Sequence, residues 1–401
     1  MPVSPINAPT DCPCDAARPA HHRALVPALA ALLLSLAAAP LRAQQAGRPD
    51  QLYVFNERTQ TVNTVTGHIK DHGLDKVRVE LGDKERSYDS LAVRAITWGQ
   101  TSADFKNAGK DAEKGDFENA VAKYRQAATD SANREPVRAA ARARAARALA
   151  AWGAADPAYF GECVEACTKF LSDHSTDRLV PEILALQARA TWLSGEASAA
   201  AVLYRTLFES GSGAEPTPGY PRLLCLSAGL SAGRAATAAG DTMAARDVYS
   251  ALQTSLASLL SAALADDPQR ASLERLSIEA GLGEGFVQIA SGQASQALNY
   301  FQGKANSEAG VQRYAAGLGL AQALFAAGRD REAMIWFARV SALEAQDRDR
   351  NAEALLGLAR CALRLSDTDA STLAKNWLGE VVASYGDTPA AGPARELSKT
   401  L

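Results

Sequence analysis

The chain has 401 residues, of which 47% are hydrophobic but only 6% aromatic, and its formal net charge is −3. This length suffices for a large buried core or an extended array of packed elements. Because aromatic residues are scarce, alanine and leucine must supply most of that core, and both favour helices. A nearly balanced charge gives no overall electrostatic drive toward nucleic acid, so no nucleic-acid partner is expected.

Residues 1–43 have the composition of a secretory signal peptide. An apolar run from Ala24 to Ala39 ends near the small residue Ala43, and four basic or imidazole side chains precede the run: Arg18, His21, His22 and Arg23. This order of segments is typical of an export signal. The alternative is a retained membrane anchor, although the run is shorter than the roughly 20 apolar residues that span a bilayer. We expect residues 44–50 to form a linker and the rest of the chain to be exported to the periplasm or cell envelope, with no stable transmembrane span after cleavage.

Four of the six cysteines follow this segment: Cys163, Cys167, Cys225 and Cys361. Cys163 and Cys167 are four residues apart, so they share one face of a predicted helix. Their scattered spacing does not match a disulfide framework. We expect unpaired, structural thiols.

Residues 51–100 are predicted to form a small antiparallel β-module. Turn-forming segments at 71–73 and 82–84 separate stretches in which β-branched and polar residues alternate, at 52–55, 61–69, 76–81 and 91–96. This period-two pattern predicts four or five short strands. His68 and His72 lie in the module without a third ligand nearby, so exposed or turn histidines are expected rather than a metal site.

The order of motifs in the β-module resembles that of SH3-like or Sm-like segments that precede helical domains in exported bacterial proteins. A Gly-x-Ile strand at Gly67–Ile69 is followed by a Val-x-Val-Glu strand at 77–80 and a closing Val-x-x-Ile strand at 93–96. The resemblance implies a barrel-like fold that leans on the first helices after it.

A short motif recurs five times in the rest of the chain: a glycine, an alanine five residues later, and an aromatic residue four after that. The five copies are Gly115–Ala120–Tyr124, Gly195–Ala200–Tyr204, Gly240–Ala245–Tyr249, Gly292–Ala297–Phe301 and Gly328–Ala333–Phe337. Glycine can end a helix in the left-handed conformation that other residues avoid. The alanine and the ring then lie on one face of the next helix, at i and i+4. The motif therefore predicts repeated helix–turn–helix units that stack on one another.

These units resemble tetratricopeptide repeats. The segment Glu113–Tyr124 has the turn glycine, acidic residue, aromatic, alanine and tyrosine of that family, and Phe325–Phe337 is nearly as close. Two weaker units, Gly161–Ala166–Phe170 and Asp369–Ala374–Leu378, bring the total to about seven, although the turn before the first of them could instead lie at 153–156. Starts at 115, 161, 195, 240, 292, 328 and 369 give intervals of 34 to 52 residues, and all but one of them exceed the regular repeat of 34. The resemblance covers residues 103–401 and implies a mainly α fold, an α-solenoid preceded by the β-module.

Two glycine motifs suggest enzyme chemistry that the surrounding sequence does not support. Gly229–Gly233 fits the Gly-x-Ser-x-Gly pattern of serine hydrolases, but it lies in an Ala/Leu-rich helical stretch rather than a strand-to-helix turn. Gly281–Gly285 is similar to a phosphate-binding loop, but no strand precedes it. We expect no catalytic residues, no metal and no cofactor.

Three arginines form a stripe along one predicted helix: Arg134, Arg138 and Arg142 recur at every fourth residue, with Pro136 opening the helix. If the helix is the inner one of its pair, the stripe would line the groove where tetratricopeptide proteins hold peptides or carboxylates, a task that suits guanidinium groups. The alternative is a solvated outer face.

Family resemblance predicts a non-enzymatic protein that binds or scaffolds other proteins in the bacterial cell envelope by displaying a rigid helical surface to a peptide or protein partner. One alternative is a component of an outer-membrane or cell-division assembly machinery. Another is an enzyme with a site between the β-module and the first repeats.

Overall fold

The computed structural model describes residues 48–401 except 214, 308–310, 344–346 and 367–368. The predicted signal peptide at 1–43 and most of the predicted linker at 44–50 lie outside these residues. The part from Ala46 to Leu401 forms one compact unit.

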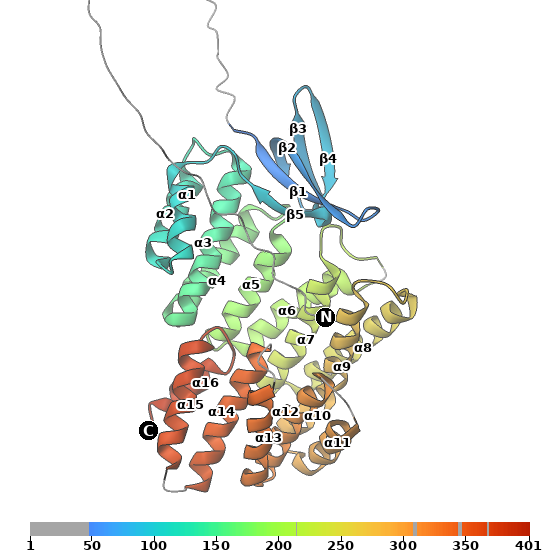
Figure 1. Cartoon of the computed structure of the whole chain (residues 1–401), viewed down its shortest axis with the longest axis vertical. Coiled ribbons are helices and arrows are strands. Elements are labelled where there is room, and N and C mark those ends of the chain that lie inside the picture. The colour runs from blue at the N-terminus through green and yellow to red at the C-terminus, as the bar shows by residue number, and fades with distance from the viewer. Residues whose placement is uncertain (1–47, 214, 308–310, 344–346, 367–368) are drawn as a thin grey trace, which may run out of the picture. The chain divides into compact units, whose positions relative to one another are not determined.

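The unit begins with a five-stranded antiparallel sheet in the order β4-β3-β2-β1-β5 (Figure 1). Its strands and one 3-10 turn are β1 (Asp50–Asn56), β2 (Thr61–His72), β3 (Lys76–Leu81), β4 (Lys84–Asp89), η1 (Ser90–Ala92) and β5 (Val93–Thr97). Strand β4 was not among the four stretches expected from the sequence. Its residues, Lys-Glu-Arg-Ser-Tyr-Asp, are nearly all exposed and lack an apolar alternation, and pairing with β3 alone makes them a strand.

Sixteen helices follow in the described part of the chain: α1 (Ala103–Glu113), α2 (Phe117–Thr129), α3 (Glu135–Ala155), α4 (Ala158–Asp173), α5 (Val180–Leu193), α6 (Ala197–Ser212), α7 (Arg222–Ala238), α8 (Thr242–Ala262), α9 (Arg270–Gly281), α10 (Gly283–Ala290), α11 (Ala294–Ser307), α12 (Val311–Ala326), α13 (Asp330–Leu343), α14 (Arg348–Leu365), α15 (Ala370–Ser384) and α16 (Ala391–Ser398).

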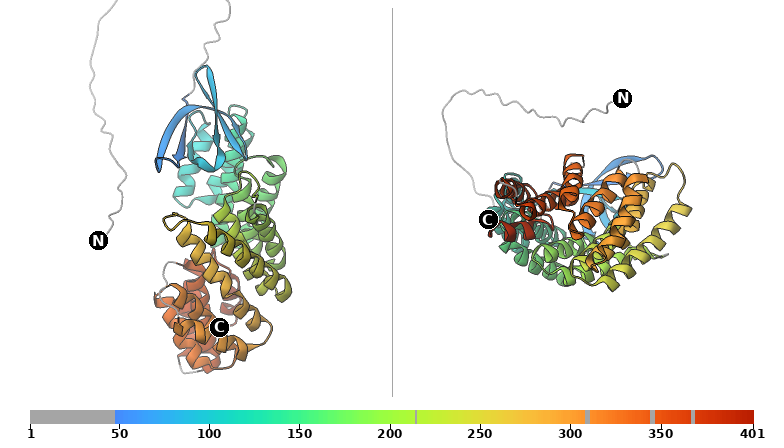
Figure 2. Two further views of the ribbon diagram at one scale, coloured as in Figure 1. Left: turned by 90° about the vertical axis from the view of Figure 1, so that its right-hand side faces the viewer. Right: turned by 90° about the horizontal axis from the view of Figure 1, so that it is seen from below.

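The helices α1–α15 form seven antiparallel hairpins that lie side by side in chain order (Figure 2). The first helices of the hairpins also touch one another in succession, from α3 to α5, α7, α9 and α10, α12 and α14. This confirms the predicted fold class, a mainly α solenoid behind a small antiparallel sheet. The longest interval, between Gly240 and Gly292, accommodates the 21-residue helix α8 and a first helix split into α9 and α10.

The motif residues occupy the turns and helix contacts of five hairpins. Each motif glycine has a positive φ, between 75° and 102°, and an added Cβ would meet nothing within 4 Å. Backbone conformation, not space, is therefore what calls for glycine there. The five motif alanines are fully buried, and the five rings are at most 5% exposed.

In the hairpin of α3 and α4, the turn falls at Asp156 and Pro157, and Gly161 lies inside α4. The hairpin therefore turns at the end of the alternative segment 153–156, at Asp156, rather than at Gly161. In the last hairpin, Ala374 and Leu378 of α15 are both fully buried although the unit has neither the glycine nor the ring.

The rings of the second helices pack against glycines of neighbouring first helices. A Cβ built on Gly233 of α7, or on Gly283 of α10, would lie 2.5 Å from the Tyr249 ring. Gly229 meets Phe208 in the same way, at 2.7 Å. Four glycines of the two enzyme-like motifs, Gly229, Gly233, Gly283 and Gly285, are thus positions of close helix contact, whereas Gly281 has open space beside it. Ser231 lies within α7, and its hydroxyl donates to the Ser227 carbonyl (3.1 Å).

The sheet shares its core with the first hairpins. Leu52, Val79 and Trp98 belong to the same buried cluster as Phe105 of α1 and Val137 of α3. Polar contacts strengthen this junction. The carboxylate of Asp50 is fully buried and accepts hydrogen bonds from Arg134 Nη2 (2.7 and 2.9 Å) and from the N–H groups of Ile69 and Gly99 (both 2.9 Å).

His72 also lies in this junction, and the expectation of an exposed or turn histidine was wrong for it. Its side chain is 4% exposed, its Nδ1 lies 3.0 Å from Asp177 Oδ2, and its ring meets the Trp98 ring edge-on at 5.5 Å. This contact could not be predicted from the sequence because Asp177 lies in the segment between α4 and α5, 105 residues away from His72. Among the described residues, no group of three or more His, Cys, Asp or Glu side chains could hold a metal ion.

No helix of the described residues combines the length and apolar character needed to cross a membrane. The four cysteines of this part are free and buried. Burial raises the pKa of Cys225 to about 11 and that of Cys361 to about 12, and a hydrogen bond with Cys163 together with burial raises the pKa of Cys167.

We predict that these four thiols are unreactive in the folded protein. Burial keeps the reagent away from all four thiols. Thiolates are the reactive species, and the raised pKa values of Cys167, Cys225 and Cys361 also keep these three protonated. In a chain starting at residue 44, 5,5′-dithiobis(2-nitrobenzoate) at pH 8 should label no thiol within minutes, and four after unfolding in guanidinium chloride. Fast labelling of any thiol under native conditions would contradict the packing of α4, α7 or α14.

Candidate functional site

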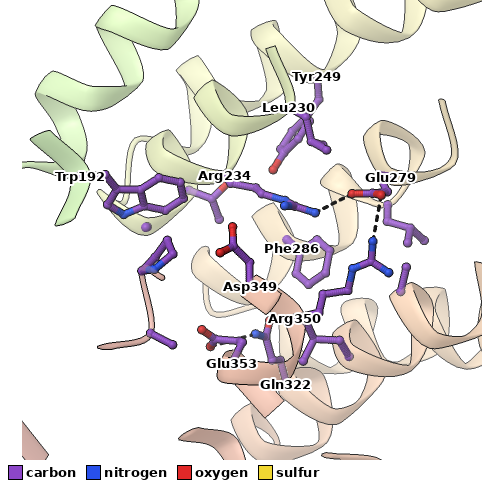
Figure 3. A pocket seen from close by; sticks show the side chains of 17 residues that line it. Trp192, Leu230, Arg234, Tyr249, Glu279, Phe286, Gln322, Asp349, Arg350 and Glu353 are labelled. Atoms are coloured by element: carbon purple, nitrogen blue, oxygen red, sulfur yellow. Dashed lines mark hydrogen bonds and ion pairs between the residues drawn. The ribbon is translucent and has the colours of Figure 1, made fainter. Parts of the chain in front are cut away.

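A cavity of about 270 Å³ lies between the first helices of the hairpins (Figure 3). Residues of the first helices α5, α7, α9, α10, α12 and α14 line it, together with Tyr249 of α8 and with Pro389 and Ala390 from the segment before α16. Side chains from five hairpins therefore meet in one place, although they are spread over nearly 200 residues of sequence. Aromatic and aliphatic walls come from Trp192, Leu230, Tyr249, Phe286 and Leu318.

Contacts between distant hairpins close this part of the array. Arg189 of α5 donates to both carboxylate oxygens of Asp349 on α14 (2.6 and 3.0 Å) and to the carbonyl of Asp387 (2.8 Å). Farther along, Arg395 of α16 donates to the Ala154 carbonyl at the end of α3 (3.2 Å). These bonds link α3 and α5 to α14–α16, so the cavity is bounded on more than one side by the chain itself.

Glu279 of α9 joins two arginines across the cavity. Its Oε2 accepts from Arg234 Nη2 of α7 at 2.7 Å, and its Oε1 accepts from Arg350 Nη2 of α14 at 2.9 Å (Figure 3). Arg350 also forms an ion pair with Asp347 (2.8 Å). The side chains of Glu279 and Arg350 are only 10% and 6% exposed. Charge-assisted hydrogen bonds of this kind fix the relative positions of the helices that they join.

Glu353 lies one helical turn after Asp349 on α14, and both carboxylates face the cavity (Figure 3). Gln322 Nε2 of α12 donates to Glu353 Oε1 at 3.2 Å. Burial raises the pKa of Glu353, and the charge of Arg360 on the same helix only partly opposes this effect. Asp349 is paired with Arg189, whereas no ion pair of Glu353 is found within the described residues.

We predict that Glu353 makes the protein less stable as pH rises. A carboxyl whose folded-state pKa exceeds its unfolded value binds more protons when folded, so the free energy of unfolding falls as pH increases through that interval. Glu353→Gln should therefore stabilise the protein at pH 8 but hardly at pH 4, by about 1.4 kcal/mol for each unit of pKa difference. Urea unfolding of both proteins from pH 4 to 8 measures this. Parallel curves for the two proteins would contradict the pKa assigned to Glu353.

The stripe arginines lie outside this cavity, on the side of α3 that faces the sheet and the turn after α4. Arg134 binds Asp50 and donates to the Ile69 carbonyl (2.9 Å). Arg138 Nε donates to Glu135 (2.9 Å), and Arg142 Nη1 lies 2.8 Å from His174 Nε2. Burial and the charge of Arg142 lower the pKa of His174, which favours a neutral ring that accepts from Arg142. All three arginines thus have partners within the chain, and their role in binding another molecule stays a prediction.

Sequence reasoning did not find the cavity because no motif marks it. Its acids and arginines follow no recurring pattern and lie on helices that are otherwise rich in alanine and leucine, and only the curvature of the array brings those of different helices together. One signal was available: Asp349 and Glu353 are four residues apart in a stretch, 347–365, whose other face is apolar. Charges at that spacing beside a buried face indicate a polar site or a solvated edge.

Comparisons with known proteins bear on the fold alone. No protein-family model and no curated protein sequence matches the chain. Among solved structures, a tetratricopeptide repeat protein from Parabacteroides merdae ATCC 43184 is similar over 74% of this chain and 96% of its own, with 16% identity and a TM-score of 0.45. Ton1535 from Thermococcus onnurineus NA1 matches 73% of this chain and 99% of its own, with 15% identity and a TM-score of 0.20. The architecture given above therefore rests on the hairpins of this chain.

Proposed function

We propose that this protein is a non-enzymatic binding scaffold whose first helices capture a segment of a partner protein. The observation that carries the proposal is the cavity itself, in which five hairpins contribute side chains held in place by ion pairs across the array. A receptor that is ordered before binding loses less conformational entropy when the partner arrives. Aromatic and arginine side chains, which line this cavity, are also the residue types that dominate binding energies in protein interfaces.

The test is site-specific photo-crosslinking in cells. The photo-reactive residue p-benzoyl-phenylalanine would replace Trp192 in the cavity wall or, as the control, Val202 on α6, which is 66% exposed. The proposal predicts a discrete crosslinked protein from position 192 and none of that mass from position 202. No adduct at position 192, with the protein folded by circular dichroism, would reject it.

We also propose that the scaffold works in the bacterial cell envelope, and this location can be tested separately from partner binding. The support is the apolar run at 24–39 and the resemblance of the repeats to envelope tetratricopeptide proteins. Alkaline phosphatase is active only after export, so a fusion of residues 1–50 to this enzyme should be active. An inactive fusion would contradict the proposed location in the cell envelope. A role in outer-membrane or cell-division assembly is the more specific version of this proposal.

An enzyme site between the sheet and the first hairpins is the second candidate class, and the His72–Asp177 pair is the arrangement there that most resembles catalytic machinery. However, both side chains are less than a tenth exposed, and the Trp98 ring packs against the imidazole. A base needs to reach a substrate proton directly or through one water. The pair therefore fits a structural role at the junction.

A further inference from the structure

We propose that the inner cavity is a receptor for an organic cation, an ammonium or guanidinium group on an apolar stem, with Glu353 as its counter-ion. This inference rests on the proposed binding function and names the chemistry that the site selects. The shared chemistry could be presented by a lysine or arginine side chain of a partner or by a free amine.

The size of the cavity favours a single side chain or a ligand of that size. Its volume, about 270 Å³, lies just below the range of about 300–1,000 Å³ found for pockets that hold drug-sized molecules. The cavity is lined by helices of five hairpins and by Pro389 and Ala390. A long peptide would therefore insert one residue here rather than lie along it.

The balance of charge in the walls determines the sign of the ligand. Two guanidinium groups, of Arg234 and Arg350, and three carboxylates, of Glu279, Asp349 and Glu353, line the cavity. Both guanidinium groups bond Glu279, and Asp349 is paired with Arg189. Glu353 is the third acid, held by the neutral amide of Gln322, and the charge of Arg360 elsewhere on α14 opposes the effect of its burial only in part. An entering cation would therefore gain an ion pair with Glu353 in a partly buried site, where such pairs are stronger than in open water, whereas an anion would be repelled by the excess of carboxylates in the walls.

The other walls suit the stem of such a ligand. Trp192, Phe286 and Tyr249 contribute aromatic surface to the cavity (Figure 3). Aromatic faces attract cations, and Trp does so most strongly. Trp192 is itself held edge-on by Tyr204, with ring centroids 6.4 Å apart, so its position is set before a ligand enters. Leu230 and Leu318 complete an apolar surface for the methylene groups of the stem.

The test is calorimetric titration of the purified protein at pH 8 with small probes that share a stem and differ in charge. The cationic probes are N-acetyl-arginine N-methylamide, N-acetyl-lysine N-methylamide and the free amines agmatine and cadaverine. The N-methylamides of N-acetyl-norleucine and N-acetyl-glutamate are the neutral and anionic comparators. The variant is Glu353→Gln, which keeps size and can still accept from Gln322. The matched control is Glu332→Gln, because Glu332 lies on the neighbouring α13, is 54% exposed and pairs with Arg329.

We expect the cationic probes to bind and the two comparators not to bind. Glu353→Gln should weaken cation binding about tenfold or more, and Glu332→Gln should leave it unchanged. Equal binding of free amines and blocked amino acids supports a free amine as a natural ligand, and preference for the blocked forms supports a partner side chain. Binding of norleucine or glutamate derivatives as tight as that of the cations, no binding of any cation, or an unchanged affinity in Glu353→Gln would each overturn the inference.

This outcome is separable from the outcome for the scaffold proposal. A crosslinked partner at position 192 without cation binding would support the scaffold proposal and reject the cation site. Cation binding that depends on Glu353, without any crosslinked protein, would keep the site as a receptor for a free amine and remove the protein-binding proposal.

Discussion

Replacing Ala333 by arginine should destabilise the protein by about 3–5 kcal/mol, because it places an uncompensated charge in a helix contact that has no room for it. Ala333 lies on α13, is fully buried, and belongs to the cluster that contains Phe337 and the residues of α12 and α14. Thermal and urea unfolding followed by circular dichroism measure the loss.

Ile335 provides a control two residues away on the same helix. It is 54% exposed, so Ile335→Arg introduces the same side chain into α13 without burying its charge. We expect this variant to unfold within about 0.5 kcal/mol of the wild-type protein, as is usual for surface substitutions. Equal stabilities of the two variants would mean that α13 does not pack through its motif face.

Asp50→Ala should loosen the sheet from the helical array at a cost of about 3–5 kcal/mol. The substitution leaves the Arg134 guanidinium without the buried carboxylate that it pairs with, and it removes the acceptor of the Ile69 and Gly99 N–H groups. Breaking one side of a buried ion pair costs this much because the other charge stays behind. Hydrogen exchange should accelerate in β1–β5 and α3 while α12–α15 keep their protection.

Asp71→Ala is the matched control for this prediction. Asp71 belongs to the same sheet and also pairs with an arginine, Arg78 (2.9 Å), but both side chains are about half exposed. Exposed pairs of this kind contribute about 0–1 kcal/mol. If the two variants changed exchange in the sheet equally, Asp50 would not anchor the sheet to the array.

Local rules predicted most of the fold because each hairpin is specified by residues close together in the sequence. A glycine with positive φ, a small residue and a ring on the following helix define a turn and a contact, and the five copies of this motif lie at five turns of the array. Strand β4 was not predicted because its exposed, charged sequence has no strand pattern of its own. Its conformation is set by pairing with the neighbouring strand β3.

The candidate site could not be predicted in the same way because it depends on contacts between residues far apart in the sequence. Arg189 meets Asp349 across 160 residues, and Glu279 meets Arg350 across 71. Such pairs follow from the curvature of the array, which changes with every irregular helix length, such as those of α8 and of the split α9–α10. His72 and Asp177 illustrate the same limit in the junction with the sheet.

The central claim is that the hairpins form one preordered array whose distant parts already touch before any partner binds. Electron–electron double resonance between spin labels on Val202→Cys of α6 and Leu373→Cys of α15 tests this claim directly. Both positions are exposed, at 66% and 41%, and the four native thiols of the array are buried. We predict a single narrow distance distribution for the unbound protein. A broad or multimodal distribution would show that α5 and α14 separate freely and that the cavity is not formed in advance.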